Sequence, residues 1–306
     1  MEISTEVIMA IAERVRVKIR EPLSRYTTFR TGGPADLLVE PEDAASCALV
    51  VRIAREAGIP LTVIGGGSNL LIGDKGVDGI VCRMCEYPER PAAIRIRDDG
   101  TIYTSASVLK ERFIEAAIEA GFGGVEFLAG IPGCIGGGVS MNAGTNMGTI
   151  VEVLCEVECV TADGSLRAIP VHRGMAGYRS MNLDNVAVIT GAAFRLEPAA
   201  DIQSVRDAIS GILAERRKKH PLDFPSAGSV FKNPPGESSW KLINDAGLKG
   251  RSVGGARVSD LHTNFIINTG NATSRDILEL IGIVRETVSK VFGVTLEPEV
   301  KMIGNF

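Results

Sequence analysis

The chain has 306 residues, and a prior of about 150 residues per domain predicts two or three lobes. Its composition, 45% hydrophobic and 23% charged, is ordinary for a globular protein, and a net charge of −4 argues against a basic face that binds nucleic acid. No run of about 18 apolar residues and no leader pattern occurs, so we expect a cytoplasmic protein with no membrane contact.

The first 200 residues predict a β-rich region with interspersed helices. The expected elements are a helix over 41–58, a strand over 61–64, a hairpin over 93–105, a helix over 107–120, a hairpin over 151–169 and a strand over 186–195. Gly58 and Gly121 end the two helices, and Ser107 is the expected cap of the second.

The residues after 200 have a different pattern. We expect a helix over 201–219, a Pro- and Gly-rich loop over 221–239, a short helix near Trp240, a strand over 262–268, a helix over 274–292 and a terminal strand over 294–303. The irregular mixture predicts an α+β protein. We expect one domain over 1–200, with lobes at about 1–85 and 86–200, and a smaller α+β domain over 201–306.

The six cysteines do not form a disulfide scaffold in a chain of this length. Cys82 and Cys85 have CxxC spacing, but there is no second pair and only three histidines are present, so we favour packing over a redox or metal site. Cys155 and Cys159 alternate with valines in a predicted strand, and we place both thiols on its apolar face. No metal site is predicted.

Two glycine clusters interrupt the first 200 residues. Gly65-Gly66-Gly67 directly follows the strand over 61–64 and fits neither GxGxxG nor GxxxxGK[ST]. The second cluster, 130–144, holds six glycines interleaved with apolar residues such as Ile131 and Ile135. Glycines permit positive φ and let backbone amides approach an anion. We infer that the two loops hold one long cofactor with a diphosphate and a flat ring, and FAD fits this description.

These loops belong to a longer series of motifs. The series is TFRTGGPA (28–35), GGGSNLL (65–71), GIPGCIGGG (130–138) with MNAG (141–144), GYRS (177–180), AGSVFKNP (227–234), HTNFIIN (262–268) and LEPEV (296–300). In content and order it resembles the UDP-N-acetylenolpyruvoylglucosamine reductases, in their shorter form, over nearly the whole chain. One departure is Thr145-Asn146-Met147-Gly148, where members often carry an aromatic residue.

The resemblance implies a flavoenzyme of peptidoglycan precursor synthesis. It implies a vanillyl-alcohol-oxidase-like, two-lobed FAD-binding domain and a smaller UDP-sugar domain, with NADPH-dependent reduction of UDP-N-acetylglucosamine-enolpyruvate to UDP-N-acetylmuramate. FAD should be non-covalent, because neither loop contains a histidine and only Cys134 could tether it. The expected cofactor-binding residues are Gly65, Gly66, Gly67, Ser68, Asn69, Gly130, Ile131, Pro132, Gly133, Gly136, Gly137 and Asn142.

The same resemblance implies three catalytic residues. Ser229 matches the proton donor of the family, although by itself a serine in a Gly- and Pro-rich loop is a turn former. Arg179 matches the group that binds the carboxylate or enolate oxygen, which suits a permanently charged guanidinium, although its pattern alone indicates a surface arginine. Glu299 matches a group that helps to steer protonation, although its pattern alone indicates an exposed strand residue.

Three further residues, Tyr178, Lys219 and Asn233, are expected to bind the UDP-sugar. Lys219 lies in the run Arg-Arg-Lys-Lys-His (216–220) at the end of a predicted helix. Cations there also complement the helix dipole, so a purely structural role stays open beside contact with the UDP diphosphate.

Two other functions stay open at this point. An FAD-dependent 2-hydroxy-acid oxidase or dehydrogenase would use the same cofactor fold, but the residues after 200 offer no obvious oxidase base. A catalytically silent nucleotide-sugar-binding protein would keep the fold, but the presence of Arg179, Ser229 and Glu299 argues against it. The expected partners are the UDP-sugar and NADPH, and the sequence is compatible with a monomer.

Overall fold

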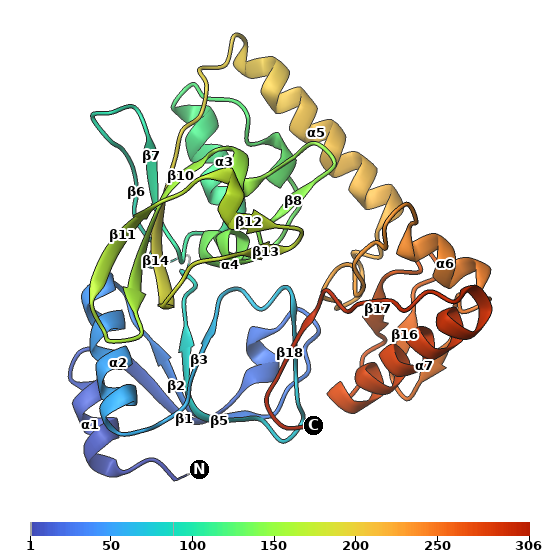
Figure 1. Ribbon diagram of the computed structural model, residues 1–306, viewed down its shortest axis with the longest axis horizontal. Helices are drawn as coiled ribbons and strands as arrows, with labels where there is room; N and C mark the ends of the chain where they lie inside the picture. Colours follow the sequence, from blue (N-terminus) through green and yellow to red (C-terminus); the bar gives the residue numbers. More distant parts are fainter. Residues whose placement is uncertain (1, 88) are drawn as a thin grey trace. The chain divides into compact units, whose positions relative to one another are not determined.

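The computed structural model describes residues 2–87 and 89–306 (Figure 1). Its contacts define two compact units. Unit 1 comprises Met1–Ile19, Leu37–Gly66 and Gly79–Ala214, and unit 2 comprises Arg20–Asp36, Gly67–Asp78 and Glu215–Phe306. Both units are discontinuous in sequence. The domain boundary near residue 200 stays a prediction.

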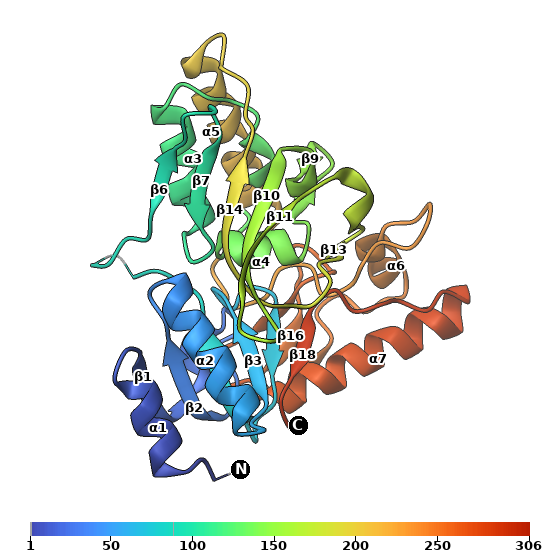
Figure 2. The ribbon, with the colours of Figure 1, turned by 60° about the vertical axis from the view of Figure 1, so that its left-hand side comes forward.

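Residues 5–83 contain a four-stranded sheet and two helices. Its elements are α1 (Thr5–Ala12), β1 (Arg16–Pro22), η1 (Leu23–Tyr26), β2 (Pro34–Glu40), α2 (Ala44–Glu56), β3 (Leu61–Ile64), β4 (Leu70–Ile72) and β5 (Val77–Arg83). The sheet order is β1-β2-β5-β3, and β3 runs parallel to β5. Figure 2 shows α1 and α2 beside β2 and β3, in agreement with a shared buried cluster of their apolar side chains.

Helix α2 shows how local sequence and tertiary packing combine. Asp43 caps its N-terminus by accepting a 2.7 Å hydrogen bond from the amide of Ser46, and Gly58 follows its end with φ of 63°. The helix therefore begins three residues later than predicted. Its buried face packs against β2 and β5 and also against Val160 and Val188 of the second sheet, so one helix contributes to a core shared by two sheets.

The second sheet of unit 1 is antiparallel, in the order β11-β10-β14-β7-β6. The remaining elements here are β6 (Ile94–Ile96), β7 (Ile102–Ser105), α3 (Lys110–Glu119), η2 (Glu126–Leu128), α4 (Ile135–Ser140), β8 (Gly144–Thr145), β9 (Gly148–Thr149), η3 (Ile150–Glu152), β10 (Leu154–Thr161), β11 (Leu166–Pro170), η4 (Arg173–Met175), β12 (Ala176–Gly177), β13 (Ser180–Met181) and β14 (Val186–Phe194). Helices α3 and α4 pack on this sheet through a large apolar core. The departure at Thr145–Gly148 forms the small β8–β9 hairpin, with Met147 exposed at its tip.

Three predictions for this region are wrong. Helix α3 has Leu109, not Ser107, as its N-cap, because the carboxylate of Glu86 accepts the amide hydrogen of Leu109 while Ser107 bonds to Ser105. The predicted strand over 151–161 begins only at Leu154, after the 3-10 turn η3. A register shift between Leu154 and Glu156 also leaves Cys155 half-buried, so only Cys159 of the two thiols lies in the core.

Unit 2 has a three-stranded sheet, β15-β16-β17, with helix α7 packed on it. The elements from residue 202 onward are α5 (Ile202–Lys219), α6 (Ser239–Asp245), β15 (Ser252–Val253), β16 (Ala256–Val258), β17 (Ile266–Asn268), α7 (Ser274–Phe292) and β18 (Lys301–Ile303). Helix α7 has the predicted bounds, because Thr273 and Asp276 form a capping box and Gly293 adopts φ of 70° at its end. Strand β18 pairs in parallel with β4.

Two predicted strands in this unit are too long. Residues 262–265 form a turn in which Phe265 donates to the carbonyl of His262, so only 266–268 is strand. In the predicted strand over 294–303, only 301–303 is strand, because the residues around Pro298 pair with Phe231 as an isolated bridge. The α+β prediction is confirmed by the mixture of helices with mainly antiparallel sheets.

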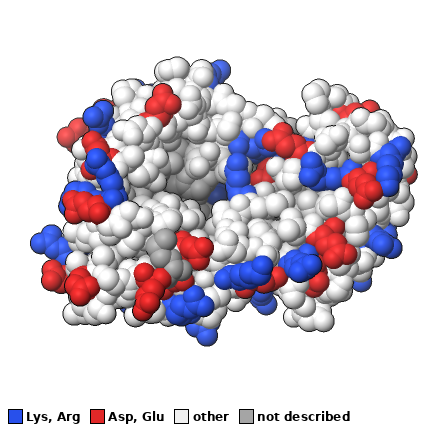
Figure 3. Space-filling view, turned by 60° about the horizontal axis from the view of Figure 1, so that its bottom comes forward, with Lys and Arg blue, Asp and Glu red and all other residues white. Residues whose placement is uncertain are grey.

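The charge on one face of the molecule is mixed. On the face in Figure 3, lysine and arginine side chains are interspersed with aspartate and glutamate, without a broad field of one sign. Among the described residues, no helix is both long enough and apolar enough to span a bilayer.

Candidate active site

The first glycine loop leaves β3 and contains Gly65 and Gly66 of unit 1. Their amides have no acceptor among the described residues, and both glycines are only half-buried. A Cβ on Gly66 would lie 2.9 Å from the Cα of Gly133, so a side chain here would push the two glycine loops apart. The first glycine loop therefore offers amide donors at the point where its backbone lies close to that of the second glycine loop.

The second glycine loop turns at Gly130 and Gly133, whose φ values are 71° and 97°, and then enters α4. The amides of Ile131 and Gly136 donate to the carbonyls of Leu128 and Ala106, so these two residues shape the loop by their own backbone bonds. Gly137 is exposed, and a Cβ there would have no atom within 4 Å. Pro132 is also exposed on this loop.

These two loops fit a dinucleotide cofactor such as FAD. The amides of Gly65 and Gly66 can donate to a diphosphate. The space beside Gly137, where a Cβ would meet no atom within 4 Å, is open to another part of the cofactor. The donor set therefore agrees with the cofactor expected from the sequence.

Asn142 connects the second loop to the candidate arginine. It is buried with φ of 40°; its Nδ2 donates to the carbonyl of Gly177, and its Oδ1 accepts the amide hydrogen of Val151. Both ends of the Asn142 amide therefore already have protein partners. The bond to Gly177 holds the β12–β13 hairpin, which carries Tyr178 and Arg179 at its turn.

Arg179 has an uncommon backbone conformation for a residue with a side chain, with φ of 56° at the second turn position. Its guanidinium carbon lies 5.3 Å from the centre of the Tyr178 ring, at cation–π distance. Tyr178 is 55% exposed and Arg179 is half-buried. Strain of this kind is concentrated at functional sites, so the turn is a good position for a ligand-binding cation.

Ser229 lies in unit 2 on an extended segment that two other segments hold. It forms a bridge with Phe265, and the next residue, Val230, donates to the carbonyl of Asn264. Asn264 also uses its side chain: Oδ1 accepts the Phe231 amide hydrogen at 3.0 Å, and Nδ2 donates to the Phe231 carbonyl at 2.8 Å. Asn264 belongs to the HTNFIIN motif, but no local sequence pattern indicated that its side chain binds the backbone of Phe231.

Glu299 lies on the segment at the other side of Val230. Its amide donates to the Val230 carbonyl at 2.7 Å, and its own carbonyl accepts a 3.2 Å bond from Nδ2 of Asn69. Both Ser229 and Glu299 are half-buried. The structure thus brings together the backbones of two predicted catalytic residues and of Asn69, which the sequence assigned to the cofactor.

The rest of the predicted unit 2 residues have structural partners. Gly67 has φ of 66°, and a Cβ on it would lie 1.8 Å from the Tyr26 carbonyl oxygen. The carbonyl of Gly67 accepts a hydrogen bond from the amide of Thr28. The next residue, Ser68, is half-buried. Asn233 is exposed, and its Oδ1 accepts the amide hydrogen of Ser239 at the start of α6. Lys219 is exposed at the end of α5 and pairs with Glu215 at 2.8 Å.

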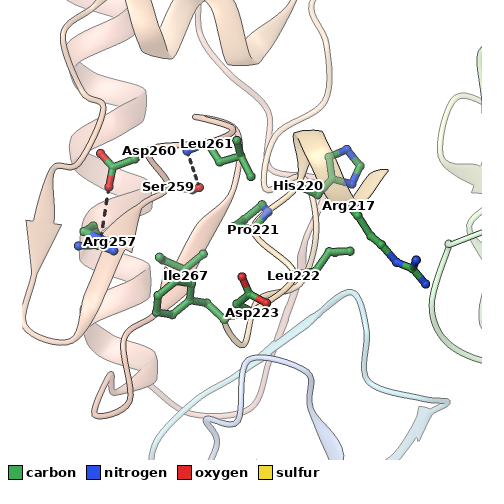
Figure 4. Close-up of a pocket in the computed structure, with 11 residues that line it drawn as sticks. Arg217, His220, Pro221, Leu222, Asp223, Arg257, Ser259, Asp260, Leu261 and Ile267 are labelled. Atoms are coloured by element: carbon green, nitrogen blue, oxygen red, sulfur yellow. Dashed lines mark hydrogen bonds and ion pairs between the residues drawn. The ribbon is translucent and has the colours of Figure 1, made fainter. Parts of the chain in front are cut away.

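Unit 2 also contains a cavity of about 370 Å³, shown in Figure 4. Its lining includes Arg217, His220, Asp223, Arg257 and Asp260, and Arg257 faces Asp260 at 4.0 Å. Two guanidinium groups opposed by two carboxylates give a balanced charge, which does not favour a diphosphate. No predicted catalytic or substrate-binding residue lines this cavity.

In the described part of the chain, no group of three His, Cys, Asp or Glu side chains is placed to hold a metal ion.

Two family models match the chain. A family model described as an FAD binding domain matches residues 35–169, and one described as the C-terminal domain of UDP-N-acetylenolpyruvoylglucosamine reductase matches residues 220–303. The first model covers both glycine loops up to Asn142, and the second covers Ser229, Asn233 and Glu299. The chain therefore carries an FAD-binding domain, and the predicted fold with a smaller second domain is confirmed.

Relatives match over almost the whole chain. The UDP-N-acetylenolpyruvoylglucosamine reductase of Anaeromyxobacter sp. (strain Fw109-5) is 42% identical over 97% of this chain and 92% of its own length. The reductase of Pediococcus pentosaceus is 43% identical, with 95% of each chain covered. The crystal structure of UDP-N-acetylenolpyruvylglucosamine reductase from Thermus caldophilus superposes with a TM-score of 0.79 at 32% identity, over 95% of this chain and 100% of that one.

The resemblance seen in the sequence motifs is thus confirmed by identity that extends through both matched domains. This chain belongs to the UDP-N-acetylenolpyruvoylglucosamine reductase family.

Proposed function

We propose that this chain reduces UDP-N-acetylglucosamine-enolpyruvate to UDP-N-acetylmuramate, with FAD as bound cofactor and NADPH as reductant, in peptidoglycan precursor synthesis. Family membership over 97% of the chain supports the reaction. The structural observation that carries the residue assignment is the backbone pairing of Val230 with Glu299, which holds Ser229 and Glu299 on adjacent segments. In this proposal the enzyme is cytoplasmic, and its sequence is compatible with a monomer.

The cofactor is held by the two glycine loops. The amides of Gly65 and Gly66 would donate to the diphosphate of FAD, and the exposed surface around Pro132 and Gly137 would face its flat ring. The other expected contacts, Gly130, Ile131, Gly133 and Gly136, act through loop shape, and Asn142 acts through its bonds to Val151 and Gly177. The chemistry that FAD supplies when bound is hydride transfer, received from NADPH and delivered to the terminal vinyl carbon of the substrate.

Ser229 donates the proton. A serine hydroxyl has a pKa far above 7, so it can protonate only a strongly basic atom, and the carbon of an enolate is such an atom. Hydride addition to the terminal vinyl carbon leaves negative charge on the carbon that bears the carboxylate, delocalised as an enolate onto the carboxylate oxygens, and the Ser229 hydroxyl delivers its proton to that carbon. The alkoxide left on Ser229 then regains a proton from solvent or a neighbour.

Arg179 and Glu299 assist this step. The guanidinium of Arg179 stabilises the negative charge on the enolate oxygens, since it stays charged, and it lies 5.3 Å from the centre of the Tyr178 ring. Glu299 steers protonation. Lys219, Tyr178 and Asn233 bind the UDP-sugar, with Lys219 on the diphosphate, and Asn233 keeps its bond to Ser239 at the start of α6.

The visible spectrum of the purified protein tests this function. We expect a yellow protein whose flavin absorbance bleaches with NADPH and recovers on addition of UDP-N-acetylglucosamine-enolpyruvate. Acid precipitation should release the colour into the supernatant, because the flavin is non-covalent; colour in the pellet would indicate a tether at Cys134. A colourless protein that binds the UDP-sugar would identify a catalytically silent binding protein and reject the proposal.

A further inference from the structure

Two cysteines of unit 1, Cys85 and Cys134, take no part in the proposed reaction. Cys134 belongs to the second loop and is 1% exposed. Its Sγ lies 3.6 Å from the position of a Cβ on Gly66, and its Cβ lies 3.8 Å from that of Gly65. The thiol of Cys134 therefore packs directly against the backbone of the first glycine loop.

The partner of Cys134 is Cys85, which follows β5 and is half-buried. Interaction with Cys134 is the largest cause that lowers the pKa of Cys85, and interaction with Cys85 is the largest cause that raises the pKa of Cys134, so the two thiols are neighbours. Their segments meet because both are anchored at Leu109: Glu86, next to Cys85, accepts the Leu109 amide hydrogen at 2.8 Å, and Leu109 forms a bridge with Cys134. Glu86 is further held by the guanidinium of Arg112 at 3.0 Å. These contacts therefore hold the backbone segments of both cysteines in place.

Two cations flank this pair. Arg83 donates to the carbonyl of Cys85 at 3.3 Å, and Lys110, which is 3% exposed, donates to the carbonyl of Cys134 at 3.4 Å. A partly exposed thiol in an electropositive surrounding is the kind that ionises and reacts. Glu40 and Glu86 act in the opposite direction, but the interaction with Cys134 is the largest influence, and the pKa of Cys85 falls to about 7.

The two thiols differ in a way that assigns them separate roles. The interaction with Cys85 and burial raise the pKa of Cys134, so Cys134 stays a thiol while Cys85 ionises. Burial also lowers the pKa of Lys110 to about 8. The other cysteines offer no such nucleophile: the pKa values of Cys82, Cys155 and Cys159 are raised, and Cys47 is buried.

We propose that Cys85 and Cys134 form a reversible redox modification site, in which hydrogen peroxide oxidises Cys85 and Cys134 resolves it as a disulfide. The disulfide joins the segment after β5 to the second glycine loop. This site goes beyond the proposed reduction of the UDP-sugar, and its formation does not depend on that activity.

The oxidation balances in two steps. The Cys85 thiolate attacks one oxygen of hydrogen peroxide; an S–O bond forms, the O–O bond breaks, and hydroxide leaves and takes up a proton as water. The Cys134 sulfur then displaces the oxygen of the Cys85 sulfenic acid, so the S–S bond forms and a second water leaves. Two thiols lose two electrons and two protons, and one peroxide becomes two waters.

Mass spectrometry on the purified flavin-loaded protein tests the proposal. After peroxide treatment and alkylation of the remaining thiols, we expect a crosslinked peptide pair with Cys85 and Cys134 and a mass about 2 Da lower than that of the two thiols. Dithiothreitol should abolish the crosslink. Cys134→Ser should trap Cys85 as a sulfenic acid that dimedone labels, whereas the control Cys155→Ser should keep the crosslink.

Wild-type protein supplies a test that needs no variant. The alkylation rate of Cys85 should rise with pH around 7, whereas Cys155 should react only at higher pH. Peroxide treatment that leaves Cys85 alkylatable, or that labels Cys155 with dimedone before Cys85, would overturn the proposal. Loss of the UDP-sugar activity alone would not, because the crosslink is measured without substrate.

Discussion

The main-chain amide of Glu299 donates a 2.7 Å hydrogen bond to the carbonyl of Val230, the residue after Ser229. Asn69 holds the carbonyl of Glu299, and Asn264 holds the next residue of the serine segment, Phe231. Each of these hydrogen bonds is made to a main-chain atom of Val230, Phe231 or Glu299. A change of the Ser229 side chain therefore leaves the frame of the site in place, and its kinetic effect reports on chemistry.

Ser229→Ala should separate the two half-reactions. Flavin reduction by NADPH needs no proton on carbon, so its rate should stay near wild type, whereas reoxidation by the enolpyruvyl sugar nucleotide should slow by about 10²–10⁴-fold. Stopped-flow absorbance of the flavin follows both steps. Ser229→Cys should restore part of the rate, because a thiol is also an acid of similar reach. Slow flavin reduction with unchanged reoxidation would remove Ser229 from the role of proton donor.

Lys219→Ala should weaken substrate binding and spare turnover. Contact with a distant diphosphate is equal in the ground and transition states, so its loss should raise KM for the UDP-sugar by about tenfold and leave kcat unchanged. Lys218→Ala is the matched control, since Lys218 is equally exposed and also pairs with Glu215. Steady-state kinetics distinguish the two. A lower kcat at constant KM, or equal effects of both variants, would contradict the diphosphate role.

Asn264→Ala should destabilise unit 2. The substitution leaves the buried amide and carbonyl of Phe231 without partners, which should lower the free energy of unfolding by about 2–4 kcal/mol. Urea unfolding at a fixed FAD concentration measures this change. Asn244→Ala, at an exposed site on α6, should cost less than about 1 kcal/mol. Similar losses in the two variants would show that the Asn264 clamp does not stabilise the serine segment.

His220 should make stability depend on pH. Burial, and then the charge of Arg216, lowers the pKa of His220 to about 4, while its ring packs against those of His262 and Phe265. Between about pH 6.5 and 4 the unfolded chain binds more protons than the folded chain, so the free energy of unfolding should fall as the pH falls through this range. His220→Phe keeps a ring and should reduce this fall.

His172→Phe, at an exposed histidine, is the control for that measurement and should leave the pH dependence as in wild type. Unfolding curves at pH 7, 6 and 5 suffice for the comparison. An unchanged slope in His220→Phe would assign the pH dependence to other groups, among them His262, whose pKa burial also lowers.

Local sequence determined those features that neighbouring residues can build. Helix α7 has its predicted bounds because Thr273, Asp276 and Gly293 make both of its ends within a few residues. Strand β3 was predicted for the same reason, as a short apolar run between Pro60 and Gly65. The glycine loops also follow from sequence, because close approach and positive φ require residues without a side chain.

Other features depend on the tertiary structure, because contacts from distant segments override the local sequence pattern. Ser107 is a good cap by type, but Glu86 reaches the start of α3 from another segment and takes the Leu109 amide, so the helix begins later. Cys155 alternates correctly with its neighbours, yet a shift in pairing with β14 turns it partly out of the core. Val230 pairs with Glu299, and Cys85 with Cys134, across long sequence separations. Periodicity and caps act over a few residues, whereas hydrogen bonds between segments are set by packing of the whole unit, so no local pattern contains them.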